Sequence, residues 1–212
     1  MKKIKICTVV TGSNLKEFLK NLEKIQEISE MVELRVDHIK NLSENDLKLI
    51  RKKTIKEAIF TSRRKEIILK ALDLGFDYID VEFSLIEELK LSKFKKTKRI
   101  ISFHDYKKTP NIQELTLTIN RMRKCNVEVL KIATMVNDNQ DIKNLFQILL
   151  NKKKNEKIIM VGMGGKGQIT RILGPLLGSF LTFASTTHGE TAPGQINIKK
   201  MKNFYKLLDT KL

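Results

Sequence analysis

Tryptophan is absent from this chain of 212 residues, and cysteine, proline and histidine are scarce, with two, three and three residues. Cys7 and Cys125 form neither a disulfide framework nor a metal-binding spacing, so we interpret both as small core residues. Few prolines and an apolar fraction of 41% exclude a disordered chain. The composition is typical of a globular α/β protein.

Long hydrophobic runs are also missing. No stretch approaches the roughly 20 apolar residues of a membrane-spanning helix. The lysines near the amino terminus resemble those of a signal peptide, but the apolar run over residues 6–10 is too short and contains Thr8. We interpret it as a first strand. The sequence therefore predicts no membrane association and a cytoplasmic location.

Charge is abundant and mostly of one sign, with a net charge of +17. Such an excess can indicate a nucleic-acid partner. Here the lysines are scattered, aromatic residues make up only 6%, and no zinc-finger or single-strand-binding signature occurs. The pattern favours a lysine-rich solvated surface over a nucleic-acid site, and that surface could attract a small anionic substrate.

Short β-branched runs alternate with amphipathic segments along the whole chain. The eight expected strands are residues 5–10, 31–37, 58–63, 78–82, 99–105, 129–135, 157–163 and 180–185. Helical patterns lie between them, as in residues 15–28, 112–125 and 141–154, and a closing helix is expected in residues 197–210. Eight such units predict a (β/α)8 TIM barrel with shortened loops, as a single domain over residues 1–212. A doubly wound open sheet is the alternative.

A glycine-rich loop follows the seventh expected strand, in "MGGKGQITR", residues 163–171. Its glycines match a dinucleotide-binding pattern, but that fingerprint normally follows a first strand. A phosphate-binding Walker loop would need Ser or Thr after Lys166, where this chain has Gly167. In a barrel, loops seven and eight commonly hold an anionic group. We therefore predict an anion site in which Arg171 takes part.

Charged residues occupy strand ends where aliphatic residues are usual. Glu33, Arg35 and Asp37 alternate in "ELRVD", which would place them on one side of the second strand. His104 and Asp105 close the fifth strand. Catalytic groups of barrels lie at the carboxyl ends of strands, so these positions are candidates for a site.

Lys131 lies within the apolar sixth strand, between Leu130 and Ile132. Burial disfavours a charged lysine and should lower its pKa. The resulting free amine could form a Schiff base with a ketone or aldehyde. Pairing with a carboxylate such as Glu82 is the structural alternative, and the residues alone leave the two equally open.

Seven motifs in order along the chain resemble the type I 3-dehydroquinate dehydratases of the shikimate pathway. They are "ELRVD" (33–37), "FTSR" (60–63), "IDVE" (79–82), "SFHDY" (102–106), "KIA" (131–133), "MGGKGQITR" (163–171) and "APGQ" (192–195). The family fold is a (β/α)8 barrel, which agrees with the strand count. The resemblance implies a lyase of aromatic amino acid biosynthesis that converts 3-dehydroquinate to 3-dehydroshikimate, with no cofactor and no metal.

The resemblance also implies catalytic roles. Lys131 would form an imine with the C3 ketone of the substrate, and His104 would remove a proton from C2 and protonate the leaving C1 hydroxyl. Substrate binding would fall to Glu33, Arg35, Arg63, Arg171, Thr191 and Gln195. Arg171 would bind the carboxylate, and Gln195 would belong to a loop that closes over the substrate.

Two positions depart from the family pattern. Thr191 stands where the family usually has serine, and the chain lacks the glutamate and glycine pair that usually follow the third strand. That glutamate orients the catalytic histidine in the family. Glu66, one residue earlier, is the candidate here, with Glu82 or Asp80 as substitutes.

Two alternatives remain at this point. Another Schiff-base enzyme, such as an aldolase, would explain Lys131 but not the other motifs. A basic barrel-derived binding protein, for nucleic acid or an anionic ligand, would explain the net charge of +17. Oligomeric state is not evident from the sequence, and a homodimer is left open.

Overall fold

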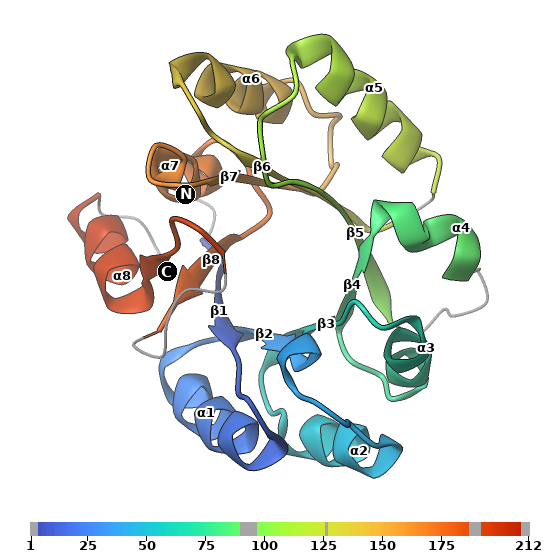
Figure 1. Cartoon of the computed structure of the whole chain (residues 1–212). Helices are drawn as coiled ribbons and strands as arrows, with labels where there is room; N and C mark the ends of the chain where they lie inside the picture. The colour runs from blue at the N-terminus through green and yellow to red at the C-terminus, as the bar shows by residue number, and fades with distance from the viewer. Residues whose placement is uncertain (1–3, 90–96, 126, 187–191, 209–212) are drawn as a thin grey trace. The chain divides into compact units, whose positions relative to one another are not determined.

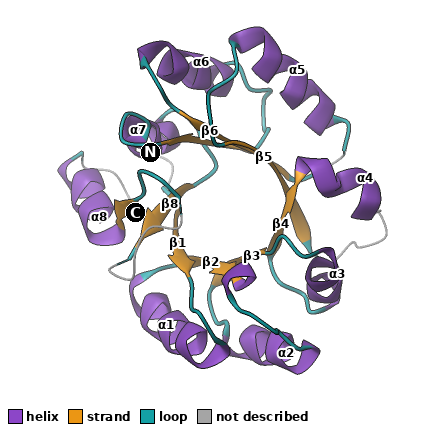
Figure 2. Cartoon of the chain, viewed as in Figure 1, coloured by secondary structure: helices purple, strands orange, loops and turns teal. Residues whose placement is uncertain are grey.

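The structure is a computed structural model that describes residues 4–89, 97–125, 127–186 and 192–208. The chain divides into two compact units. Unit 1 comprises residues 1–6 and 101–212, and unit 2 comprises residues 7–100. In each unit strands alternate with helices along the chain (Figure 2).

Unit 2 is built on four parallel strands in the order β4-β3-β2-β1. The strands are β1 (Ile6–Val10, which starts one residue before the unit), β2 (Met31–Arg35), β3 (Glu57–Thr61) and β4 (Tyr78–Glu82). The helices are α1 (Leu15–Ile28), α2 (Glu44–Lys53), α3 (Lys65–Asp73) and α4 (Ile86–Leu89), with 3₁₀ turns at Val36–His38 and Phe83–Leu85. Figure 1 shows α1, α2 and α3 along one face of these strands.

The helices of unit 2 form where the sequence provides both an apolar stripe and a cap. Asn14 caps α1 by accepting a hydrogen bond from the Glu17 amide, and Phe18, Leu22 and Ile25 form its buried stripe at spacings of four and three. Ser43 starts α2 with a reciprocal capping box. Because β2, β3 and β4 run parallel, their carboxyl ends share one edge of the sheet.

Unit 1 contains the remaining elements. Its strands are β5 (Lys98–Asp105, of which residues 101–105 belong to the unit), β6 (Val129–Met135), β7 (Ile158–Met163), β8 (Thr182–Ser185) and β9 (Ile196–Asn197). Its helices are α5 (Ile112–Arg123), α6 (Asn139–Leu150), α7 (Gln168–Leu176) and α8 (Ile198–Leu207). Strands β7, β6 and β5 are consecutive neighbours, and β8 pairs with β9.

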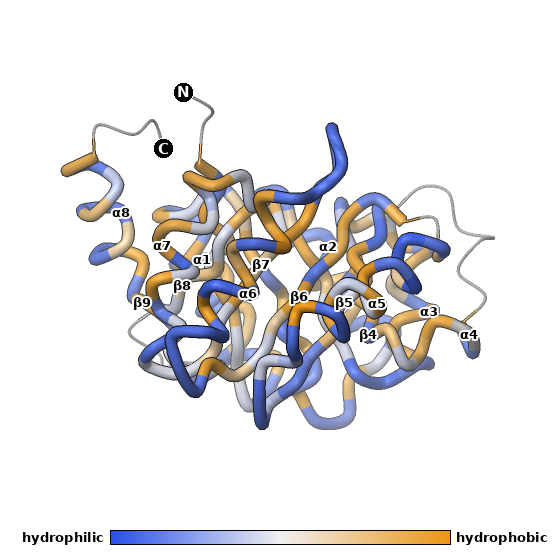
Figure 3. Tube along the Cα trace, turned by 90° about the horizontal axis from the view of Figure 1, so that it is seen from above, coloured by the Kyte–Doolittle hydropathy of each residue, from blue (hydrophilic) through white to orange (hydrophobic). Residues whose placement is uncertain are grey.

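Helix α8 closes the described chain and packs on β8. Hydrophobic and hydrophilic residues alternate along it in Figure 3, as expected of a helix with one buried face. Its buried residues Met201 and Tyr205 join Ile4, Ile6 and Ala184 in one hydrophobic cluster. Residues 4 and 6, at the start of the described chain, and the last helix of unit 1 therefore share a hydrophobic core.

The predicted strands all form, and β4 and β6 have the predicted bounds. The prediction for residues 31–37 was too long, because β2 ends at Arg35 and residues 36–38 form a 3₁₀ turn. Strand β9 was not predicted, since a run of two residues carries no period. None of the helices within the described ranges is both long and apolar enough to cross a membrane.

An ion pair links α5 to the loop before β7. The Nε of Arg123 donates to Oε1 of Glu156 over 2.7 Å, and its Nη2 donates to Oε2 over 2.8 Å. Oε2 also accepts from the Lys153 amide over 3.0 Å. The hydrogen bonds from Arg123 lower the pKa of Glu156 against the opposing effect of burial.

We predict that Glu156→Gln destabilises the protein at about pH 7 by about 1–2 kcal/mol, a fall in Tm of several degrees. A carboxylate whose folded pKa is lowered stabilises the fold above its unfolded pKa of about 4.3 and loses this effect as the pH falls through the folded value. The Tm difference between wild type and variant should therefore shrink towards about pH 3. An equal difference at both pH values in thermal melts would contradict this.

Candidate active site

In unit 2, polar and charged side chains gather at the carboxyl ends of β2 and β3. Glu33 is buried and accepts a hydrogen bond from Oγ1 of Thr61 over 3.0 Å. The two residues lie on neighbouring strands, where Arg35 is paired in register with Thr61. A buried carboxylate at this edge can accept hydrogen bonds from hydroxyl groups, which suits a polyhydroxylated ligand.

Arg35 and Asp37 form a two-pronged ion pair. Nε and Nη2 of Arg35 lie 2.9 and 2.8 Å from the two carboxylate oxygens of Asp37. Burial raises the pKa of Asp37, but the hydrogen bonds and charge of Arg35 outweigh it and lower the pKa below its usual value. The 3₁₀ turn brings Asp37 back onto Arg35, so their proximity comes from the turn and not from the strand alternation expected from the sequence.

The other predicted residues of unit 2 differ in exposure. Arg63 is exposed in the loop after β3, and Glu66 is exposed in the first turn of α3. Asp80 is buried on β4, and Glu82 is half-buried at the end of that strand. The side chain of Glu66 is thus more exposed than those of Asp80 and Glu82, the two carboxylates considered as its substitutes.

In unit 1, Lys131 lies in the middle of β6 with 7% of its surface exposed. Its Nζ is 4.6 Å from the ring centroid of Phe183 on β8, within the range of a cation–π contact. Phe183 was missed by sequence reasoning because nothing in the strand "TFAS" identifies it as a partner of a residue about fifty positions earlier. The aromatic ring and the apolar strand exclude water from much of the amine.

His104 lies near the end of β5, the neighbour of β6 in the sheet, and is half-buried. Its ring stacks on Tyr106, with centroids 5.8 Å apart and planes 8° apart. Asp105 accepts the Lys107 and Lys108 amides and so fixes the loop that follows the strand. The stacking contact with Tyr106 restricts the orientation of the histidine ring.

Arg171 lies in α7 and is only 1% exposed, the largest of the fully buried side chains in the described residues. Its Nη2 donates to the carbonyl oxygen of Pro193 over 3.3 Å. That carbonyl also accepts the Gly164 amide over 3.1 Å. One carbonyl oxygen thus joins the predicted anion-binding arginine, the glycine-rich loop and the "APGQ" segment.

The glycines of the loop after β7 permit close packing. A Cβ on Gly167 would lie 2.5 Å from the carbonyl carbon of Gly162. The two ends of the loop can therefore approach each other only because residue 167 has no side chain. Oγ1 of Thr170 accepts the Gly162 amide and donates to the Gly167 carbonyl, both over 2.7 Å. These contacts explain the glycines without a bound nucleotide.

The segment after β8 is described from residue 192 onwards, so the predicted substrate-binding residue Thr191 lies outside the described residues. Gln195 is 5% exposed, and its backbone N–H donates to the Ala192 carbonyl over 3.4 Å. Gly194 has a φ of +75°, and a Cβ there would lie 2.3 Å from the carbonyl oxygen of Gly164. Only glycine fits this contact between the two loops.

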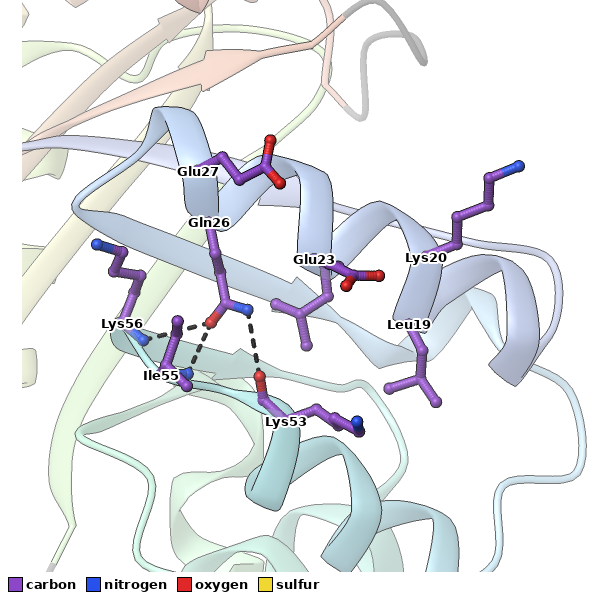
Figure 4. Close-up of a pocket in the computed structure, with 9 residues that line it drawn as sticks. Leu19, Lys20, Glu23, Gln26, Glu27, Lys53, Ile55 and Lys56 are labelled. Carbon is purple, nitrogen blue, oxygen red and sulfur yellow. Dashed lines mark hydrogen bonds between the residues drawn. The ribbon is translucent and has the colours of Figure 1, made fainter.

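Unit 2 also contains a groove that none of the predicted site residues lines. It has a volume of about 760 Å³ and runs between α1 and the segment that enters β3 (Figure 4). Gln26 spans it, accepting the Ile55 amide over 2.7 Å and donating to the Lys53 carbonyl over 3.2 Å. The groove is at the amino end of β3, opposite Thr61, so it is separate from the polar strand ends.

Metal ligands do not gather in the described part of the chain. No group of three or more His, Cys, Asp or Glu side chains there could hold a metal ion. Cys7 is buried and Cys125 is partly buried, and both are free thiols. The polar groups described above are an amine on β6, an imidazole near the end of β5, guanidinium groups and carboxylates, which suit acid–base and imine chemistry.

Comparison with known proteins identifies the chain's relatives. A model of the family described as Type I 3-dehydroquinase matches residues 6–211. The 3-dehydroquinate dehydratase of Coxiella burnetii (strain RSA 493 / Nine Mile phase I) is 40% identical, with 95% of this chain and 92% of the relative covered. That of Methanocaldococcus jannaschii is 35% identical over 97% of this chain and 100% of the relative.

Solved structures give the same answer for the fold. The 3-dehydroquinate dehydratase of Geobacillus kaustophilus superposes with a TM-score of 0.88 at 22% identity, covering 98% of this chain and 92% of that one. The type I enzyme of Clostridium difficile gives 0.85 at 27% identity, covering 98% and 93%. The predicted TIM-barrel fold is thereby confirmed.

The contact between Gly194 and Gly164 yields a prediction. Gly194→Ala should detach the two loops, because a left-handed backbone costs a non-glycine residue about 1–2 kcal/mol and its Cβ would overlap the Gly164 carbonyl oxygen. We expect hydrogen exchange of the Gly164 amide to accelerate by about tenfold or more.

Gly165→Ala is the matched control, since a Cβ on Gly165 meets nothing within 4 Å. Its exchange at Gly164 should stay at the wild-type rate. Equal acceleration in both variants would mean that the loop responds to any added methyl group, and the specific contact would be disproved.

Proposed function

Because the chain belongs to the type I 3-dehydroquinase family, we propose that it converts 3-dehydroquinate to 3-dehydroshikimate through an imine formed on Lys131. The observation that carries this proposal is a lysine 7% exposed within an apolar strand, which is the neighbour of the strand that carries His104 near its carboxyl end. The side chain of a lysine held in this way has a defined position from which its amine can act as a nucleophile towards a ketone.

Lys131 begins the reaction. Its Nζ attacks the C3 ketone of the substrate, and loss of the carbonyl oxygen as water leaves a protonated imine. This cation withdraws electrons from the C2–H bond and acidifies that hydrogen. The lysine thus supplies the electron sink, so the proposed chemistry uses no metal and no organic cofactor.

His104 carries the proton. Its imidazole takes the C2 hydrogen as a general base, and the electron pair left behind forms an enamine with the imine carbon. The same imidazole then protonates the C1 hydroxyl, which departs as water while the enamine electrons form the C1–C2 double bond. Hydrolysis of the imine releases 3-dehydroshikimate and restores Lys131. Stacking on Tyr106 at 5.8 Å supports a fixed ring orientation for both transfers.

The remaining site residues would recognise the substrate. We propose that Arg171 binds the carboxylate, because a planar guanidinium offers two parallel donors to two oxygens. Glu33 and Arg35 would bind the ring hydroxyls, and their hydrogen bonds to Thr61 and Asp37 support this by fixing both side chains before the substrate arrives.

Three further roles belong to the same proposal. Arg63 and Thr191 would assist substrate binding, and Gln195 would contact the substrate from the segment after β8. We also propose a cytoplasmic enzyme, acting as one catalytic domain and assembled as a homodimer.

Borohydride reduction in the presence of 3-dehydroquinate provides the direct test. We expect the intact mass of the wild type to increase by a single reduced adduct, because borohydride traps the imine as a stable amine. Lys131→Ala should gain no adduct and should lose turnover by about three orders of magnitude or more.

Lys157→Ala is the matched control, a lysine at the boundary of β7 whose Nζ lies 5.2 Å from the Phe180 ring centroid. It should still form the adduct. An adduct retained in Lys131→Ala would assign the imine to another lysine, and a wild type that forms neither adduct nor product would refute the proposed function.

Glu66 is proposed to orient His104, and Glu66→Gln should slow turnover by about tenfold or more while leaving the borohydride adduct intact. Glu44→Gln is the control, since Glu44 is also exposed in the first turn of a helix. Asp80→Asn and Glu82→Gln extend the series. Wild-type turnover in Glu66→Gln would remove this residue from the site and leave Asp80 or Glu82 as the orienting carboxylate.

A further inference from the structure

Helix α7 carries a proline close behind its buried arginine. Pro175 lies inside the helix, four residues after Arg171. In a regular α-helix the amide of residue 175 would donate to the carbonyl of residue 171, but proline has no N–H. The backbone carbonyl of the arginine proposed to bind the substrate carboxylate therefore loses its normal helical partner.

Two hydroxyl groups from outside the helix reach this carbonyl. Oγ1 of Thr182, the first residue of β8, donates to it over 2.8 Å. The hydroxyl of Tyr205, on α8, lies 3.2 Å from the same oxygen and 2.8 Å from the carbonyl oxygen of Ile172. Thr182 thus supplies the donor that Pro175 withholds, and Tyr205 shares its single hydroxyl hydrogen between the carbonyl oxygens of Ile172 and Arg171.

Both hydroxyls are held firmly. Tyr205 is fully buried in the cluster that contains Ile4, Ala184 and Met201, and Thr182 is 2% exposed. Burial raises the pKa of Tyr205, so its hydroxyl stays protonated as a donor. Water has no access to replace a missing donor, which makes an unpaired carbonyl at this place costly.

We propose that Thr182 and Tyr205 are positioning residues for Arg171: their hydroxyls replace the helical hydrogen bond that Pro175 removes and so fix the arginine for the substrate carboxylate. The inference rests on the proposed function of Arg171. Loss of either hydroxyl would let the α7 backbone shift at residue 171, and a small displacement of a two-pronged guanidinium weakens binding of a carboxylate.

The test uses Thr182→Val and Tyr205→Phe, which each remove one hydroxyl at nearly constant volume. We expect KM for 3-dehydroquinate to rise by about fivefold or more, while kcat stays within about threefold, because the imine chemistry at Lys131 is untouched. Pro175→Ala restores an N–H facing the Arg171 carbonyl. Added to Thr182→Val, it should return KM to within about twofold of wild type.

Thr54→Val is the matched control. Thr54 is buried and its hydroxyl donates to the Ile50 carbonyl at the end of α2 over 2.7 Å, a similar bond far along the chain from Arg171. The Tm of Thr54→Val should fall about as much as that of Thr182→Val, while its KM for 3-dehydroquinate stays at the wild-type value. This control separates loss of stability from loss of positioning.

The outcomes are distinct. An unchanged KM in Thr182→Val and Tyr205→Phe, or a raised KM that Pro175→Ala does not reverse, would overturn the positioning role. If Tyr205→Phe does not fold, the Thr182→Val and Pro175→Ala pair still decides it. Wild-type protein that makes no 3-dehydroshikimate would instead refute the proposed function, before any variant is compared.

Discussion

Burial of the Arg171 guanidinium is the constraint on which much of unit 1 depends. A charged side chain at 1% exposure is tolerated only where hydrogen bonds compensate for lost water. Its Nη2 therefore binds the Pro193 carbonyl, which in turn fixes the Gly164 amide. The arginine, the glycine-rich loop and the segment after β8 must be placed together, because each satisfies polar groups of another.

Close packing also explains the glycines that matched a nucleotide-binding pattern in the sequence. The glycines after β7 and β8 permit close approach, since Gly167 packs on Gly162 and Gly194 packs on Gly164 at distances that no side chain allows. A helix with an internal proline requires outside donors for its carbonyl groups. The glycine-rich motif thus positions a buried arginine, and its resemblance to a nucleotide-binding loop is limited to the spacing of its glycines.

Unit 2 shows a parallel arrangement with different partners. Arg35 is held by Asp37, and Glu33 accepts from Thr61, so both charged side chains of β2 already have a hydrogen bond that restrains them. Restrained groups lose less conformational entropy when a ligand binds. The proposed imine formation and proton transfer require such restraint, since both steps tolerate little misplacement.

The sequence by itself determined the order of strands and helices, because periodicity and caps are local properties. It also marked Lys131, His104 and Arg171 as candidate site residues, since charged residues in apolar strands and an ordered set of motifs are visible in the sequence. The tertiary structure alone decided that Phe183 faces Lys131 and that a hydroxyl on α8 reaches a carbonyl 34 residues earlier. It also ended β2 at Arg35 and added β9. These features depend on contacts between residues far apart in the chain, which packing of the folded protein creates and which no local pattern encodes.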